Sequence, residues 1–180
     1  MPHISERGAA LPASPIRKLT PYAEAAKARG VKVYHLNIGQ PDLPTPEKAM
    51  EAIRSIDKRT LSYSMSQGTP ALREEFSKYY RTFGIDLDPD EIIVTAGGSE
   101  ALLATFLTCF DPGDEVIITE PGYANYLSFA EAAGLVVKAV TSKIENGFAL
   151  PSAEDFKKAI TPRTKAILIC NPNNPTGYLY

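Results

Sequence analysis

The sequence predicts an α/β fold in which a mostly parallel sheet is flanked by helices. The first observation is a set of four short apolar runs, rich in β-branched residues, in the second half of the chain. Nearly continuous apolar runs of this kind are typical of strands that are buried on both faces. The second observation is that helical patterns lie between these runs, at a spacing of roughly 20 to 30 residues. Strands and helices that alternate in this way form βαβ units with right-handed crossovers.

In the first half of the chain, three helices are expected to begin at a Thr-Pro pair, because threonine caps a helix and proline fits its first turn. The pairs are Thr20 with Pro21, Thr45 with Pro46, and Thr69 with Pro70. The expected helices cover residues 21–29, 46–56 and 70–83, and a glycine follows the first and the last of them. A short strand is expected at 33–39, followed by a proline-rich loop at 40–46.

In the second half, the pattern of the side chains predicts four strands and three helices in alternation. The expected strands are 91–96, 115–119, 135–140 and 165–170. The expected helices are 99–110, 124–134 and 153–160, and Ser152 is the N-cap of the last. This half is therefore the α/β layer of the molecule.

Composition and charge are those of a soluble globular protein and give no support to a nucleic-acid or membrane partner. Hydrophobic residues make up 44% of the 180 residues, charged residues make up 22%, and the formal net charge is −2. These values are typical of a soluble globular chain and give no basic excess for nucleic acid or a membrane surface. No apolar run approaches the roughly 20 residues needed to cross a bilayer, and the opening residues do not resemble a signal peptide. A cytoplasmic protein is expected.

The two cysteines are expected to be buried free thiols. Cys109 and Cys170 lie in apolar runs, and neither has the spacing of a disulfide framework or a zinc site. With only two histidines in the chain, no metal site is expected.

Open α/β sheets bind ligands at the carboxyl ends of their strands, so the segments that follow the apolar runs are the candidate sites. The first is AGGSEAL, in which Gly97 and Gly98 allow a close approach and Ser99 and Glu100 begin a helix. Free amides at the helix start and the Ser99 hydroxyl would suit an anion, most plausibly a phosphate. The alternative is a tight strand-to-helix turn with no ligand.

The second and third segments are EPGYANY and CNPNNPTG. Tyr123 stands at the end of a strand, where its ring could stack on a flat heterocycle or simply fill a packing gap. In the third segment Asn171, Asn173 and Asn174 alternate with prolines. This arrangement restricts the backbone and can hold side-chain amides toward a ligand.

These segments together resemble the pyridoxal 5'-phosphate (PLP) aminotransferases of fold type I, the class I and II group, in their aspartate-aminotransferase-like form. The resemblance covers nearly the whole chain, and its blocks are SPIRKLTPYAEAAKARG, LNIGQPDLPTP, YSMSQGTPALREEF, VTAGGSEAL, DPGDEVIITEPGYANY and NPNNPTG. It implies a cytoplasmic homodimer of amino acid metabolism, a transferase that moves an amino group between an amino acid and a 2-oxo acid.

The resemblance also implies a role for seven residues. The cofactor phosphate would lie on the amides around Gly98, Ser99 and Glu100, and the ring of Tyr123 would stack on the cofactor pyridine. Asn174 would donate to the phenolic oxygen of the cofactor and favour its phenolate form. Tyr63 would reach the phosphate of the neighbouring subunit's cofactor, and the main chain of Gly39 would meet the substrate carboxylate.

No catalytic residue is assigned, because the resemblance places the Schiff-base lysine beyond NPTG. We therefore expect the chain to be the amino-terminal part of such an enzyme, with the large domain incomplete at its carboxyl end. The expected division is a mobile arm at 1–13, a helix, strand and loop of the small domain and active-site rim at 14–60, and the first part of the PLP-binding large domain at 61–180.

Two other interpretations remain open at this stage. Another fold type I enzyme, such as a lyase or a decarboxylase, would use the same cofactor-binding segments. A non-catalytic phosphate-binding or interaction module could reuse the scaffold. In neither case does the sequence indicate a nucleic-acid or membrane partner.

Overall fold

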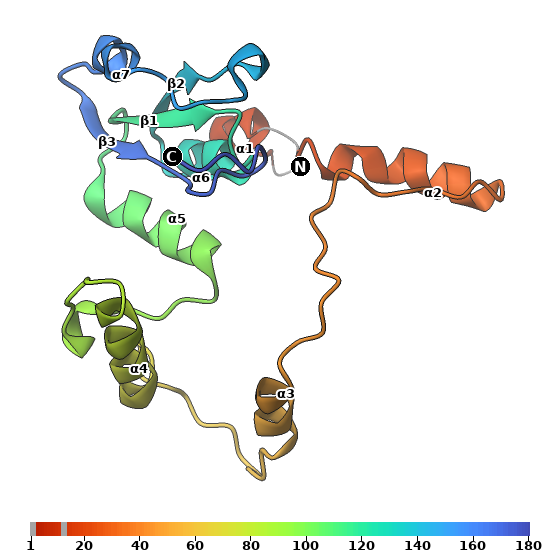
Figure 1. The fold of residues 1–180 in the computed structure, drawn as a ribbon, viewed down its shortest axis with the longest axis vertical. Coiled ribbons are helices and arrows are strands. Elements are labelled where there is room, and N and C mark those ends of the chain that lie inside the picture. Colours follow the sequence, from red (N-terminus) through yellow and green to blue (C-terminus); the bar gives the residue numbers. More distant parts are fainter. Residues whose placement is uncertain (1–2, 12–13) are drawn as a thin grey trace. The chain divides into compact units, whose positions relative to one another are not determined.

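The computed structural model describes residues 3–11 and 14–180, and it divides into two units. The first unit combines Met1–Thr20 with Ala96–Tyr180, and the second is Pro21–Thr95. Figure 1 shows the elements of both units in chain order. The two units are described separately below.

A parallel three-stranded sheet forms the centre of the first unit. Its strands are β1 (Glu115–Glu120), β2 (Val136–Thr141) and β3 (Thr164–Leu168), and their order in the sheet is β2-β1-β3. These are three of the four strands predicted for the second half of the chain. The middle strand is the most deeply buried, and its residues from Glu115 to Thr119 are all buried.

The main core lies where two helices pack on one face of this sheet. The helices are α5 (Gly98–Cys109) and α6 (Asn125–Ala132), each close to its expected range. Phe106 of α5 and Ala130 of α6 share a hydrophobic cluster with Val116 and Ile118 of β1. Burial of these side chains is the main force that fixes the helices against the sheet.

The remaining helical elements of the first unit are short. They are α1 (Glu6–Ala10), η1 (Arg17–Leu19), η3 (Ile144–Asn146) and α7 (Ala153–Ala159). Ser152 caps α7 as expected, because its hydroxyl accepts a hydrogen bond from the backbone N–H of Asp155, and the Asp155 carboxylate accepts from the Ser152 backbone in return. The mobile arm predicted for 1–13 lies partly outside the described residues, and its described part contains α1.

A buried carboxylate ties the amino ends of the three strands together. Glu115, the first residue of β1, is fully buried and accepts hydrogen bonds from the hydroxyls of Thr161 at 2.7 Å and Thr164 at 3.3 Å. Arg163 donates to it at 3.0 Å, and the Lys138 ammonium lies 3.7 Å away. The hydrogen bond from Thr161 is the largest cause that holds the pKa of Glu115 below its ordinary value, against the opposing effect of burial.

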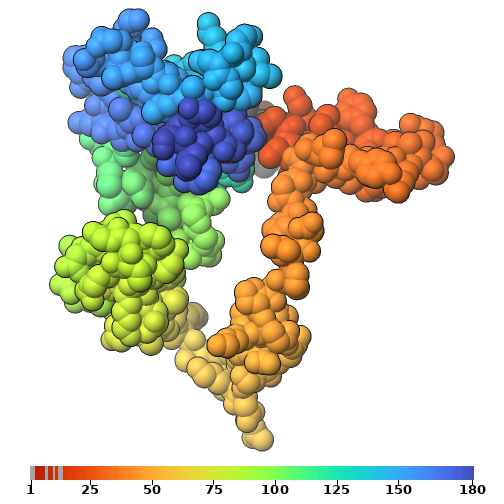
Figure 2. All heavy atoms as spheres, in the orientation of Figure 1, coloured from red at the N-terminus to blue at the C-terminus, as the bar shows by residue number. Residues whose placement is uncertain are grey.

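The second unit is helical and contains α2 (Thr20–Ala28) from Pro21 on, α3 (Glu47–Arg54), α4 (Pro70–Arg81) and η2 (Pro89–Glu91). Its best-packed part is the contact between α4 and η2. Arg73 of α4 is buried and donates to the carbonyl of Pro89 at 2.8 Å and to Asp90 at 3.0 Å. By contrast, the stretch from 31 to 46 is exposed over most of its length (orange in Figure 2).

The turn before α4 packs closely against Val94 at Gly68. The backbone N–H of Val94 donates to the carbonyl of Gln67 at 2.9 Å, so residues 92–95 lie alongside this turn. Gly68 has a φ of +97°, and a Cβ at this position would lie 2.7 Å from the Val94 side chain. Only glycine meets both conditions.

Two strands expected from the sequence do not form. Residues 33–39 contain a turn, and residues 92–96 are extended or bent without any ladder, after a 3-10 turn that ends at Glu91. Apolar or alternating residues make a strand only where a neighbour accepts and donates its hydrogen bonds, and in the described residues neither segment has a paired strand.

Two smaller expectations were also wrong. The N-cap of α3 is Pro46 rather than Thr45, so the helix begins one residue later than the Thr-Pro pair suggests. Cys109, the last residue of α5, is exposed, and Cys170, two residues after β3, is half-buried; neither belongs to the core cluster.

Candidate functional site

The start of α5 offers hydrogen-bond donors that the helix itself does not use. The N-cap is Gly97, with a φ of +94°, and the first backbone bond at this end runs from Ala101 to the carbonyl of Gly97. The backbone N–H groups of Gly98, Ser99 and Glu100 therefore have no carbonyl acceptor within the helix. The Ser99 side chain is exposed, and no hydrogen bond links it to another described residue.

The side chain of Glu100 reaches back to the residue before the N-cap. Its carboxylate accepts a hydrogen bond from the backbone N–H of Ala96. A carboxylate at the third helical position that reaches back past the N-cap stabilises the helix start. Glu100 can therefore contribute its backbone amide to an anion site while its charge is held by the chain before the helix.

The loop after β1 holds the ring of Tyr123 in a defined orientation. Tyr123 is half-buried, and its hydroxyl accepts a hydrogen bond from the Asn125 side chain at 2.9 Å. The ring of Tyr126 meets it edge to face, with centroids 5.4 Å apart and planes at 82°. Such aromatic pairs fix the direction of both rings.

Tyr126 itself is a neutral phenol in the physiological range. Burial, followed by the neighbouring Cys170 thiol, raises the pKa of Tyr126 to about 12. Tyr126 and Cys170 come from the segments after β1 and β3, so their contact brings these two segments together.

The segment after β3 divides its asparagines between two environments. Asn174 is exposed, and its side chain has no hydrogen-bond partner among residues 3–11 and 14–180. Asn173 is buried and donates from Nδ2 to the Pro121 carbonyl at 3.0 Å and to the Thr176 hydroxyl at 2.8 Å. Sequence reasoning selected Asn174 and missed the part that Asn173 plays, because the motif does not reveal which amide faces inward.

The topology directs three of the predicted segments toward one end of the sheet. Tyr123 and Asn174 follow the carboxyl ends of β1 and β3. The last turn of α5 leads through a short connection into the amino end of β1, so α5 starts toward the opposite, carboxyl end (Figure 1). Direct contact links the Tyr123 and Asn174 segments, through Asn173 and Pro121.

The other two predicted residues belong to the second unit. Tyr63 is fully exposed in an extended segment before α4. Gly39 is also exposed, and a Cβ at this position would meet nothing within 4 Å. Both positions are open, as a contact with a substrate or a second subunit would require.

Lysines of the first unit are placed as surface or structural residues. Lys138 pairs with Glu115 at the amino end of the sheet, and Lys157 and Lys158 pair with acids on α7. Lys143 follows β2 but is exposed to solvent. Because these lysines are either ion-paired or exposed to solvent, none of them is assigned as a Schiff-base lysine.

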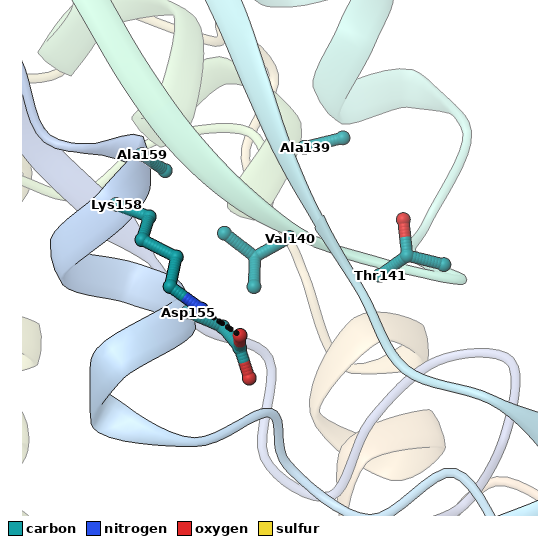
Figure 3. Close-up of a pocket in the computed structure, with 6 residues that line it drawn as sticks. All are labelled: Ala139, Val140, Thr141, Asp155, Lys158 and Ala159. Carbon is teal, nitrogen blue, oxygen red and sulfur yellow. Dashed lines mark ion pairs between the residues drawn. The ribbon is translucent and has the colours of Figure 1, made fainter.

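A pocket of about 360 Å³ lies elsewhere, between β2 and α7 (Figure 3). Its lining residues are Ala139, Val140, Thr141, Asp155, Lys158 and Ala159. None of the predicted site residues borders it, and an ion pair between Lys158 and Asp155 spans its edge at 3.5 Å.

The described residues contain neither a metal-binding cluster nor a helix suited to span a membrane. Within the part of the chain that the structure describes, no group of three or more His, Cys, Asp or Glu side chains is suited to hold a metal ion. Over the same residues, no helix has the length and apolar character needed to cross a membrane.

Comparisons with known proteins agree on one family. The family model for aminotransferases of class I and II matches residues 31–180. The aspartate/prephenate aminotransferase of Thermus thermophilus is 39% identical over 179 residues, which are 98% of this chain and 46% of that protein. The chain thus spans about half the length of the curated relatives that it matches.

Solved structures give the same result. A double mutant of the Thermus thermophilus aspartate aminotransferase superposes with a TM-score of 0.93 at 39% identity, and the match covers 100% of this chain and 47% of that one. An alanine aminotransferase from Pyrococcus furiosus superposes with a TM-score of 0.91 at 36% identity, covering 99% of this chain and 46% of that one.

Proposed function

The chain belongs to the class I and II aminotransferases, and from this premise we propose that the protein acts as a PLP-dependent transaminase that moves an amino group between an amino acid and a 2-oxo acid. The observation that supports it most is the family match over 31–180, which includes every residue predicted for the cofactor. This chain would supply the surface that holds the cofactor phosphate and ring.

The donors at the start of α5 fit a phosphate. The amides of Gly98, Ser99 and Glu100 and the hydroxyl of Ser99 are hydrogen-bond donors at the positive end of a helix dipole. The Glu100 carboxylate accepts a hydrogen bond from the Ala96 amide, so it does not occupy the backbone amides of Gly98, Ser99 and Glu100. The phosphate of PLP would be held here.

The two strand-end loops fit an aromatic ring with an ionisable oxygen. Tyr123 presents a ring whose hydroxyl is already bonded to Asn125, so its face can stack on the pyridine. The amide of Asn174 is free to donate to the phenolic oxygen, and donation to the charged form favours the phenolate. When bound, PLP supplies an aldehyde that carries the amino group and a ring that accepts electron density.

The second unit would contribute to the substrate and to assembly. The main chain of Gly39 would meet the substrate carboxylate, and Tyr63 would reach the phosphate of a neighbouring subunit's cofactor in a homodimer. Relatives named for aspartate, prephenate and alanine support an amino acid and a 2-oxo acid as the substrate class. A cytoplasmic location is proposed with this function.

A chimaeric protein tests the proposal directly. Residues 1–180 would replace the aligned half of the Thermus thermophilus enzyme, which is 39% identical in this region. We expect the chimaera to bind PLP and to convert amino acid and 2-oxo acid pairs. We expect Ser99→Ala and Asn174→Ala to weaken PLP binding about tenfold each, which is the loss of one hydrogen bond to a charged group.

Two outcomes would overturn the proposal. A chimaera that folds, as judged by its circular dichroism, but does not bind PLP would show that these residues are not a cofactor surface. A chimaera that binds PLP and releases carbon dioxide or an eliminated product, with no amino-group transfer, would assign the chain to a different reaction of the same cofactor. Asn146→Ala is the matched control, because Asn146 is exposed and lies in none of the segments proposed to bind the cofactor.

A further inference from the structure

We propose that Asn173 is a positioning residue that fixes the loop carrying Tyr123 to the loop carrying Asn174. In this role it sets the angle at which a stacking ring and an amide donor meet one ligand. The identity of that ligand rests on the proposed function, but the link between the two loops does not, so the two can be tested separately.

The contacts of Asn173 join residues that are far apart in the sequence. Its Nδ2 donates to the carbonyl of Pro121 at 3.0 Å, across 52 residues, and to the hydroxyl of Thr176 at 2.8 Å. Its backbone N–H donates to Tyr178 at 2.8 Å, and its carbonyl accepts from Gly177 at 2.7 Å. One residue therefore closes its own loop and also ties it to the loop after β1.

Each end of this link lies beside a proposed ligand group. Pro121 is two residues before Tyr123, and Asn173 is the residue before Asn174. Gly122 adjoins Tyr123, and a Cβ at Gly122 would lie 2.7 Å from the carbonyl oxygen of Thr119. The turn is thus too tight to absorb a displacement, so movement at Pro121 would be passed on to the ring of Tyr123.

The burial of Asn173 indicates that it is not present for stability alone. The residue is 4% exposed, and its Oδ1 has no hydrogen-bond partner among the described residues. A buried acceptor without a donor destabilises the folded state, whereas an apolar side chain of similar size would avoid that penalty. What an apolar residue could not supply is the donor pair that reaches Pro121 and Thr176.

The first experiment measures hydrogen–deuterium exchange by mass spectrometry on the full chain without ligand. In Asn173→Ala we expect exchange about tenfold faster in peptides that cover both loops, 119–126 and 169–180, because the hydrogen bonds of the Asn173 side chain to Pro121 and Thr176 are lost. Peptides from β2 should be unchanged. Asn146→Ala, an exposed asparagine of η3, should alter neither loop.

The second experiment uses PLP as the probe, in the chimaera described above. In Asn173→Ala we expect the dissociation constant for PLP to rise about tenfold. We also expect a smaller induced circular dichroism per bound PLP, because the ring of Tyr123 is no longer held in one orientation. A loss of stability alone would lower the melting temperature but leave the signal per bound molecule intact.

The outcomes separate this inference from the proposed function. If wild type does not bind PLP but Asn173→Ala loosens both loops, the proposed function fails and the link stands. If exchange in 119–126 is unchanged in Asn173→Ala, the inference is wrong whatever PLP does. Should Asn173→Ala not fold, Thr176→Val removes one acceptor and keeps the Pro121 contact, so 169–180 should loosen and 119–126 should not. The opposite result would overturn the proposal.

Discussion

Replacing Gly68 by alanine should destabilise the protein far more than the same change at Gly84. Both glycines have a left-handed backbone, with φ of +97° at Gly68 and +75° at Gly84. A Cβ at Gly84 would meet nothing within 4 Å, whereas a Cβ at Gly68 would lie 2.7 Å from the Cβ and Cγ2 of Val94. The pair therefore separates backbone strain from steric overlap.

The expected magnitudes follow from these two terms. Alanine in the left-handed region costs about 1–2 kcal/mol, partly offset by a smaller entropy of the unfolded chain. We therefore expect Gly84→Ala to lower the free energy of unfolding by about 1 kcal/mol. Overpacking against a β-branched side chain adds about 1–3 kcal/mol, so Gly68→Ala should cost about 2–4 kcal/mol.

Urea denaturation followed by far-ultraviolet circular dichroism would measure both values, with the midpoint and slope fitted separately. The double variant Gly68→Ala with Val94→Gly removes the side chain that the new Cβ would overlap. It should therefore be less destabilised than the two single changes added together. The reasoning is refuted if Gly68→Ala costs no more than Gly84→Ala, or if the double variant shows no recovery.

Three further changes test the first unit. Glu115→Gln should lower the free energy of unfolding at pH values above the ordinary pKa of glutamate. Because the pKa of Glu115 is lowered in the folded state, the wild type should lose its advantage over Glu115→Gln as the pH falls through that folded pKa. Urea midpoints measured against pH for both proteins would show this. Tyr126→Phe should remove the last step, near pH 12, from the tyrosinate absorbance titration; because the folded pKa is raised, wild-type stability should fall between about pH 10 and 12. Gly122→Ala should lower the free energy of unfolding by about 1–3 kcal/mol, since the added Cβ would lie 2.7 Å from the Thr119 carbonyl oxygen.

Each of these has a contrary result. A urea midpoint that varies with acid equally in wild type and Glu115→Gln would show that the carboxylate is not the titrating group. A late tyrosinate step that persists in Tyr126→Phe would assign the raised pKa to another tyrosine. For Gly122→Ala the control is Gly39→Ala, which meets nothing within 4 Å. Equal effects of these two changes would mean that the turn after β1 can relax.

Sequence patterns predicted the helices well because helix signals are local. α4 starts at the adjacent residues Thr69 and Pro70, and the reciprocal bonds at the start of α7 join Ser152 and Asp155, which are three residues apart. The three strands of the sheet were also predicted from their apolar runs, although only β1 is buried along nearly its whole length, whereas β2 and β3 are partly exposed. Strands at 33–39 and 91–96 failed, because a strand depends on a partner that the local pattern does not contain.

The candidate site was predictable in its segments but not in its internal contacts. The turn at Gly98 and the ring of Tyr123 follow from their place after apolar runs. The different environments of Asn173 and Asn174 could not be read, because the amide that turns inward is chosen by a carbonyl 52 residues earlier. Likewise, the hydroxyl bond of Tyr123 to Asn125 depends on how the loop closes.

The buried Glu115 has a consequence for how this fold can change. It gathers contacts from all three strands at one pole of the sheet, while the proposed ligand groups occupy the other pole. Cohesion and recognition are therefore assigned to separate sets of side chains. The proposed ligand groups can therefore be substituted one at a time, while the hydrogen bonds and ion pairs of Glu115 at the other end keep the three strands together.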